Sequence, residues 1–264
     1  MDSDPVKVLG CDISLNHGGI VELVDGKLSN FWYYTDLAGS AGKSKCGTRM
    51  PTWSDIKDRQ TKQMARLAWI EHYLDKRVFM KSLPQYVGIE DYALDAKHGA
   101  HYQGEVGGIA RILAWFRGFQ MRLHDPISLK MYAAHNGTAD KDAVEQAVLS
   151  RWELNFGVLN QPQAPPRKDG KIPKPNRQTS QDLCDAYALA HLIWLEVRLR
   201  RGEVLLKDLH QKEVQIFNRV TKSYPVSLLD REWIANPDGV PTPHGEPVCA
   251  TCGSRRCCNA KEAV

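Results

Sequence analysis

Apolar residues near the start of the chain occur in short runs, a pattern that predicts strands. The run from Val6 to Ser14 is apolar and ends close to an acid, and the next two β-rich runs are separated by Asp25-Gly26. An Asp-Gly pair between such runs is typical of a tight hairpin turn. The first part of the chain therefore predicts three strands, of which the second and third are antiparallel.

Helical spacing begins after a Gly/Ser/Lys-rich segment. From Asp58 to about Arg77, apolar residues recur at helical intervals, and further helices are predicted over about 105–123, 140–155 and 180–195. Short strands are predicted over 85–94 and near 127–133. A meander of strands followed by strands that alternate with helices predicts a mixed α/β sheet with helices on its faces.

The length of the chain, 264 residues, allows one substantial core and an appendage. We expect a main domain over residues 1–207 and an irregular extension over 208–264, where the periodic pattern weakens. No run approaches the roughly 20 apolar residues of a membrane-spanning helix, and the first ten residues lack the pattern of a signal peptide. These features favour a cytoplasmic protein.

Charge is informative through its distribution. The net charge of the chain is only +4, but the Pro-rich segment from Gln163 to Gln178 carries five cations and one acid. A nucleic-acid backbone would be attracted there. The candidate DNA contacts are Arg167, Lys168, Lys171, Lys174 and Arg177. An ordinary solvated loop is the alternative.

The seven cysteines do not form the pattern of a secreted disulfide framework. Four of them lie in the last sixteen residues, where zinc could bind to sulfur ligands. The candidate zinc ligands are Cys249, Cys252, Cys257 and Cys258, with His244 as a further candidate. A redox-sensitive tail without metal is the alternative.

Four acids follow a pattern that favours metal binding. Asp12 and Glu90 each end an apolar run, while Asp182 and Asp185 share one face of a helix. The carboxyl ends of parallel strands meet at one edge of a sheet, so these acids would gather there and need cations. Carboxylate oxygens suit Mg²⁺ or Mn²⁺, and two such ions can bracket a scissile phosphate.

Two other readings of these acids stay open. Asp182 and Asp185 could complement the dipole of the helix, with Thr179 or Ser180 as the N-cap. Asp91 could point inward in place of Glu90 if the strand register differed by one residue.

The order of these motifs resembles the RuvC-type Holliday junction resolvases of the RNase H-like superfamily, particularly their phage-type members. The segments that carry the resemblance are "GCDIS", "VGIEDY", "DLCDAYALA" and "GTADKDAVEQAV", within a span from about Val6 to Leu195. The last segment matches the one that holds the family's DNA-contacting lysine, here Lys141. The resemblance does not extend to the basic insert over about 39–62, the Pro-rich loop or the C-terminal region.

This resemblance implies an RNase H-like mixed five-stranded sheet and a homodimer that cuts branched DNA. The implied activity is that of a Mg²⁺-dependent crossover junction endonuclease, active in DNA recombination and repair, whose two Mg²⁺ (or Mn²⁺) ions are held by Asp12, Glu90, Asp182 and Asp185. Trp115, Phe116 and Phe119 are candidates for the dimer interface, with core packing as the alternative. The divergent inserts suggest a phage origin. A nuclease for RNA/DNA hybrids or flaps, and a non-catalytic junction-binding protein, are the competing hypotheses.

Overall fold

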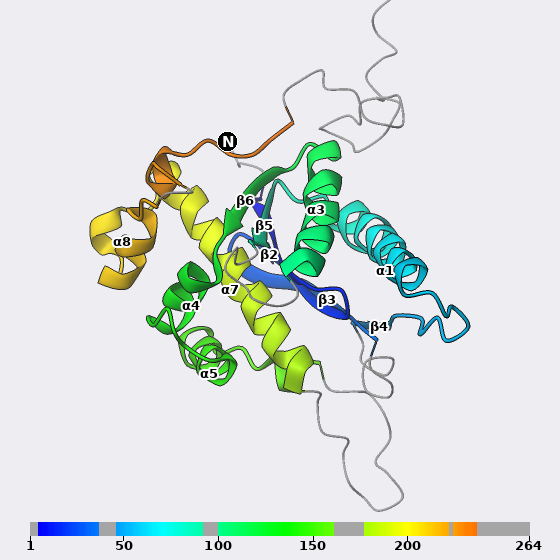
Figure 1. Cartoon of the computed structure of the whole chain (residues 1–264). Helices are drawn as coiled ribbons and strands as arrows, with labels where there is room; N and C mark the ends of the chain where they lie inside the picture. The colour runs from blue at the N-terminus through cyan, green and yellow to red at the C-terminus, as the bar shows by residue number, and fades with distance from the viewer. Residues whose placement is uncertain (1–4, 37–45, 92–99, 161–176, 222–223, 237–264) are drawn as a thin grey trace, which may run out of the picture.

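A mixed six-stranded sheet forms the centre of the molecule, in a computed structural model that describes residues 5–36, 46–91, 100–160, 177–221 and 224–236 (Figure 1). The strand order is β4-β3-β2-β1-β5-β6. The strands are β1 (Lys7–Ile13), β2 (His17–Val24), β3 (Lys27–Thr35), β4 (Gly47–Arg49), β5 (Tyr86–Glu90) and β6 (Gln120–His124). The predicted mixed α/β sheet flanked by helices is thus confirmed.

The predicted meander forms β1, β2 and β3. Each strand pairs antiparallel with the next, and the Asp25-Gly26 turn that joins β2 to β3 has positive φ angles of 49° and 77°. Positive φ at both central residues is the requirement of the type I′ hairpin turn. The strands β5 and β6 run parallel to β1, which brings their carboxyl ends to one edge of the sheet.

Three elements differ from the prediction. The helix expected over 105–123 ends at Phe116, because Gly118 takes a φ of 72° and the chain then forms β6. The strand expected near 127–133 is a helix, since Asp125 caps it and Pro126 occupies its first turn. The strand β4 was not predicted, and with β6 it makes six strands rather than five.

Helices cover both faces of the sheet (Figure 1). One face carries α7 (Arg177–Arg200), whose apolar side packs on Val8, Val21 and Leu23. On the other face, Leu9, Cys11, Ile20, Val87 and Ile89 share a core with α1 (Arg59–Tyr73), the π-helical turn η2 (Leu74–Phe79) and α3 (Ala100–Phe116). The other helices are α2 (Met80–Ser82), α4 (Pro126–Ala134), α5 (Lys141–Trp152), α6 (Phe156–Leu159) and α8 (Gln211–Phe217), with the 3₁₀ turns η3 (Leu206–Asp208) and η4 (Leu228–Asp230).

Glycines let α7 lie unusually close to the sheet. A Cβ atom on Gly10 would come within 2.0 Å of the Ala186 carbonyl oxygen, and one on Gly19 would come within 2.7 Å of the Asp182 carbonyl group. Side chains at these positions would push the helix outward. The absence of Cβ atoms therefore sets the height of α7, and of the acids it carries, above β1 and β2.

Residues after α7 pack back onto the domain. Phe217 and Leu228 share a core with Leu192, and Ile234 forms an antiparallel bridge with Met121 at the edge of β6. The domain boundary near residue 208 stays a prediction, and the Cys-rich tail with its candidate zinc ligands lies outside the described residues. Within the part of the chain described, no helix is long and apolar enough to cross a membrane.

The aromatic residues near the end of α3 are mostly involved in packing. Phe119 is 7% exposed and meets Phe79 edge to face, so core packing accounts for it. Trp115 is half-buried against the same core. A role for Trp115 and Phe116 in a dimer interface stays a prediction.

Candidate active site

Asp12 and Glu90 lie side by side on adjacent parallel strands. Cys11 is in register with Ile89, so the next residue of each strand falls at the same level, and a hydrogen bond joins the two carboxyl groups. Side chains alternate between the faces of a strand, and Cys11 and Ile89 belong to the core beneath α1 and α3. Asp12 and Glu90 therefore point to the opposite face, where α7 lies.

The helix α7 brings Asp182 and Asp185 to the same place. The helix begins at Arg177, so Thr179 and Ser180 are inside it and neither acid lies in its first turn. The reading of these acids as part of an N-terminal cap is therefore wrong. Asp182 is 1% exposed, and such a burial requires a specific partner for its charge.

Two basic side chains contact Asp182. The Lys141 Nζ atom donates to Asp182 Oδ1 at 3.0 Å, and His17 Nδ1 lies 2.7 Å from Asp182 Oδ2. The approach of His17 does not have the geometry of a hydrogen bond, so Asp182 Oδ2 is buried without a hydrogen-bond partner. An unsatisfied carboxylate oxygen at this depth is costly, and a bound cation would satisfy it.

The electrostatics of the four acids reflect their crowding. Burial, followed by repulsion from Asp182 and Asp185, raises the pKa of Asp12 well above its usual range. Burial and repulsion from Asp12 do the same to the pKa of Glu90, while burial and the charge of Glu90 raise the pKa of Asp185 to about 7. Burial alone would lower the pKa of Lys141, but the charges of Asp182 and Asp12 outweigh it and raise that pKa.

All four acids line one cavity of about 390 Å³. Its other charged residues are Asp91, Lys130, Lys141 and, when protonated, His17. Asp91 is neutralised elsewhere, so four carboxyl groups face two ammonium groups. Within the described residues, no group of three or more His, Cys, Asp or Glu side chains is placed as it would be around a bound metal ion. The oxygen-only donors of these acids and the unsatisfied Asp182 Oδ2 are the kind of ligands that hard divalent cations prefer.

The contacts of Asp91 separate it from Glu90. Asp91 accepts a hydrogen bond from Arg111 Nη2 at 2.6 Å and another from the Tyr224 hydroxyl group at 2.8 Å. Glu90 instead shares its hydrogen bond with Asp12. The observed register therefore favours Glu90 as the inward acid of this strand.

His17 and Lys130 belong to the cavity, although the sequence did not single them out for it. The pairing of Ile13 with Gly18 places the first residue of β2 beside the end of β1, which is what brings His17 to Asp182. The short connection between β1 and β2 in the sequence could have indicated that His17 lies close to Asp12. The sequence contained no comparable signal for Lys130, which depends on where α4 packs.

The predicted DNA contacts are only partly described. Lys141 opens α5 and reaches the cavity, and Arg177 opens α7 and forms an ion pair with Asp142. The remaining predicted contacts, at residues 167, 168, 171 and 174, lie outside the described residues.

Comparison with known proteins finds similar chains among solved structures. No family model and no curated protein matches the chain. Among solved structures, the chain is similar to T. thermophilus RuvC in complex with Holliday junction substrate, with 19% identity, a TM-score of 0.46, and coverage of 70% of this chain and 91% of that one. For the Thermus thermophilus RuvC structure, the identity is 20%, the TM-score 0.45, and the coverage 75% and 97%.

Proposed function

We propose that this protein is a divalent-metal-dependent endonuclease that cuts branched DNA, with four-way junctions as its substrate. The observation that supports this is the convergence of Asp12, Glu90, Asp182 and Asp185, from two strands and one helix, on a single cavity. Crowding and burial raise the pKa values of Asp12, Glu90 and Asp185, so the ionised carboxylates require cations. A cavity of this kind suits the hydrolysis of a phosphodiester.

The four acids would hold the metal ions. Mg²⁺ or Mn²⁺ bound there would supply Lewis acidity for the attack of water on the phosphorus atom and for the departure of the leaving oxygen. The acids themselves orient the ions, and the pairing of β1 with β5 holds Asp12 and Glu90 side by side. The carboxylates must be ionised to bind metal, so the raised pKa values imply that metal binding releases protons.

The lysines at this site would attract the phosphate backbone. Lys130 and Lys141 line the cavity, and Lys141 is about half exposed, so its ammonium group can reach a bound phosphate as well as Asp182. Cations beside an acidic site offset the repulsion between the acids and DNA. The basic segment from Gln163 to Gln178, most of which lies outside the described residues, stays a predicted DNA contact.

The choice of substrate rests on the motif resemblance. The resolvase resemblance favours four-way junctions and a homodimer that places two such cavities on one junction. The geometry of one cavity is equally compatible with other nucleic acids, since a fold does not determine a substrate. Zinc binding by the Cys-rich tail stays a separate prediction.

A cleavage assay on labelled substrates tests the proposal. We expect the protein with Mg²⁺ to cut an immobile four-way junction at paired, symmetric positions, and to leave linear duplex, flap and RNA/DNA hybrid largely intact. Asp182→Asn should abolish cutting while junction binding persists, and Asp208→Asn, which changes an exposed acid on η3, should cut normally. Full cutting by Asp182→Asn would contradict the proposal that Asp182 holds metal. Cutting confined to the hybrid or the flap would overturn the substrate, and binding without cutting under any divalent ion would make the chain a junction-binding protein.

A further inference from the structure

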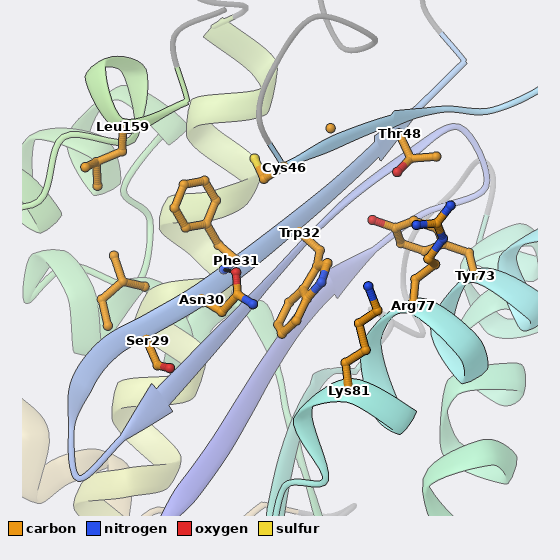
Figure 2. A pocket seen from close by; sticks show the side chains of 12 residues that line it. Ser29, Asn30, Phe31, Trp32, Cys46, Thr48, Tyr73, Arg77, Lys81 and Leu159 are labelled. Atoms are coloured by element: carbon orange, nitrogen blue, oxygen red, sulfur yellow. Dashed lines mark hydrogen bonds between the residues drawn. The ribbon is translucent and has the colours of Figure 1, made fainter. Parts of the chain in front are cut away.

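A second cavity, larger than the acidic one, lies beside the edge of the sheet at β3 and β4. Its volume is about 750 Å³, within the range of sites that hold nucleotide-sized ligands. We call it the Trp32 groove. It is lined by Leu28, Ser29, Asn30, Phe31, Trp32, Cys46, Gly47, Thr48, Tyr73, Arg77, Lys81 and Leu159 (Figure 2).

The Trp32 groove differs from the active-site cavity in its charged residues. Its lining includes the cations Arg77 and Lys81 and no acid. Both side chains are exposed, and within the described part of the chain neither makes a hydrogen bond or an ion pair. By contrast, the neighbouring Lys76 is paired with Asp75 at 2.7 Å. Two unneutralised cations in one groove favour an anionic ligand.

The local helix geometry directs these cations into the groove. Arg77 lies in the π-helical turn η2, whose Leu74, Val78 and Phe79 are buried in the core, so its exposed side faces the sheet edge. Figure 2 shows Lys81, from α2, reaching toward Trp32, and Arg77 lying beside Tyr73. π-Helical turns are rare and occur often at functional sites.

Trp32 supplies a flat aromatic surface to the same groove. It pairs with Ile20 in the sheet and packs partly on the core beneath α1, but part of its surface remains exposed. The groove wall behind it is rigid, because Tyr73 stacks on Trp69 at a centroid distance of 5.1 Å and its hydroxyl group donates to the Tyr33 carbonyl oxygen. Aromatic side chains beside cations are the recurring elements of sites for single-stranded nucleic acid.

We propose that the Trp32 groove binds a single-stranded DNA segment, with one base stacked on Trp32 and the adjoining phosphates paired with Arg77 and Lys81. A groove of this volume admits a nucleotide but not a duplex, which favours an unpaired strand. This deepens the proposed nuclease function and rests on it for the source of the strand, an unpaired segment of a branched substrate.

The position of the groove is consistent with that source. Tyr33 on β3 is in register with Gly19 on β2, and Gly19 is in register with Asp12 on β1. The strand β3, which carries Trp32, therefore lies two strand spacings from Asp12, a distance on the order of 10 Å. Trp32 itself faces the opposite side of the sheet from Asp12, because successive residues of a strand alternate. A strand that leaves the active-site cavity around the β4 edge would reach the groove within a few nucleotides.

The salt dependence of binding tests the role of the two cations. Labelled oligo(dT) of about 12 nucleotides, a length within known single-strand site sizes, is titrated with the full-length protein in EDTA, so that metal and cleavage play no part. The logarithm of the affinity decreases as the logarithm of the salt concentration rises. This negative slope should become shallower by about 0.7 for Arg77→Ala and by about 1.4 when Lys81→Ala is added. Lys207→Ala, which removes an exposed lysine on η3, is the matched control and should leave the slope unchanged. Equal slopes for wild type and the double variant would contradict the proposal that the groove binds single-stranded DNA.

A base analogue tests the stacking on Trp32. An oligonucleotide with one 2-aminopurine should lose fluorescence on binding to the wild type, and Trp32→Leu should remove this quenching and weaken binding about tenfold. Because Trp32 is half-buried, thermal unfolding of each variant checks the fold, and Trp32→Phe, which keeps an aromatic ring, should retain part of the quenching. Unchanged fluorescence on binding to the wild type, or equal quenching by Trp32→Leu, contradicts the proposal.

The two proposals fail in different ways. If junctions are never cut but single-strand binding depends on Arg77, Lys81 and Trp32, the proposed role of the groove is supported and the nuclease proposal fails. If junctions are cut and the groove variants bind oligo(dT) like the wild type, the nuclease stands and the groove fails.

Discussion

The Lys141 ammonium group lies 3.0 Å from Asp182 Oδ1, so the protein places its own cation on a carboxylate that we propose as a metal ligand. The two residues are 41 positions apart, and Asp182 is almost fully buried. A buried carboxylate without a partner is unfavourable, and Lys141 compensates Asp182 in part. The same ammonium group would compete with a divalent cation and attract a phosphate.

Replacing Lys141 therefore separates metal binding from DNA binding. We expect Lys141→Met to bind Mn²⁺ several-fold more tightly, because a competing positive charge is gone, and to bind junction DNA in EDTA several-fold more weakly, because a phosphate contact is gone. Calorimetric titration with Mn²⁺ and a DNA-binding assay measure the two effects. Lys207→Met is the control for loss of charge alone. Weaker Mn²⁺ binding by Lys141→Met would show that Lys141 organises the acids rather than competing with metal.

Crowding of the acids predicts how Mg²⁺ affects stability at different pH. Asp12 and Glu90 have raised pKa values in the folded protein, and the pKa of Asp185 rises from 3.8 to about 7. Without metal, the folded state therefore binds more protons than the unfolded state above about pH 4. It follows that the free energy of unfolding falls as the pH rises toward about 7.

A divalent cation should reverse this loss, since it binds the ionised carboxylates of the folded state. We expect saturating Mg²⁺ to raise the melting temperature by several degrees at about pH 8 and by much less at about pH 5. Asp182→Asn should reduce the effect at the higher pH. Thermal unfolding with and without Mg²⁺ measures it, and an equal shift at both values would contradict the involvement of these acids.

The sequence predicted the parts of the fold and site that depend on local patterns. The hairpin at Asp25-Gly26 and the acids at or near the ends of β1 and β5 follow from short apolar runs with characteristic ends. The boundary after α3 was missed because the apolar run continues from the helix into β6, although Gly118 and the Asp125-Pro126 pair mark the change.

Tertiary contacts account for most of what the sequence could not predict. The place of His17 depends on how β2 pairs with β1, and the Trp32 groove depends on where η2 packs against β3. Arg77 and Lys81 are ordinary surface cations in the sequence, and they become notable only because the fold places them beside an indole. Such relations carry no periodic signal along the chain.

The close packing of α7 on the sheet predicts a severe effect for a single methyl group. Gly10→Ala would place a Cβ atom 2.0 Å from the Ala186 carbonyl oxygen, and backbone cannot yield as a flexible side chain does. We expect a loss of about 3 kcal/mol or more in the free energy of unfolding, and reduced metal binding because Asp182 and Asp185 shift with the helix. Gly108→Ala, at a helical site with open space, should instead stabilise the protein by up to about 1 kcal/mol. Urea unfolding measures both, and similar behaviour of the two variants would contradict the packing argument.

The hydrogen bonds of Glu196 indicate how the residues after α7 are held on the domain. It is fully buried and accepts hydrogen bonds from Arg122 Nη2 at 2.6 Å and Arg200 Nε at 2.9 Å, while both arginines also donate to the Arg231 carbonyl oxygen. Glu196→Ala would leave the buried guanidinium group of Arg122 and the partly buried one of Arg200 without their carboxylate, which typically costs about 3–5 kcal/mol. We expect that loss in urea unfolding, together with faster proteolysis between η3 and Ile234.

The matched control for Glu196 is Glu203, which pairs with Arg198 at 3.3 Å on the surface. Because exposed ion pairs contribute little, Glu203→Ala should change the free energy of unfolding by less than about 1 kcal/mol and leave proteolysis unchanged. If the Glu196 variant lost stability without faster proteolysis after α7, the buried carboxylate would stabilise the helix and sheet alone. In that case Ile234 and the apolar contacts of Phe217 and Leu228 would be sufficient to hold the C-terminal residues in place.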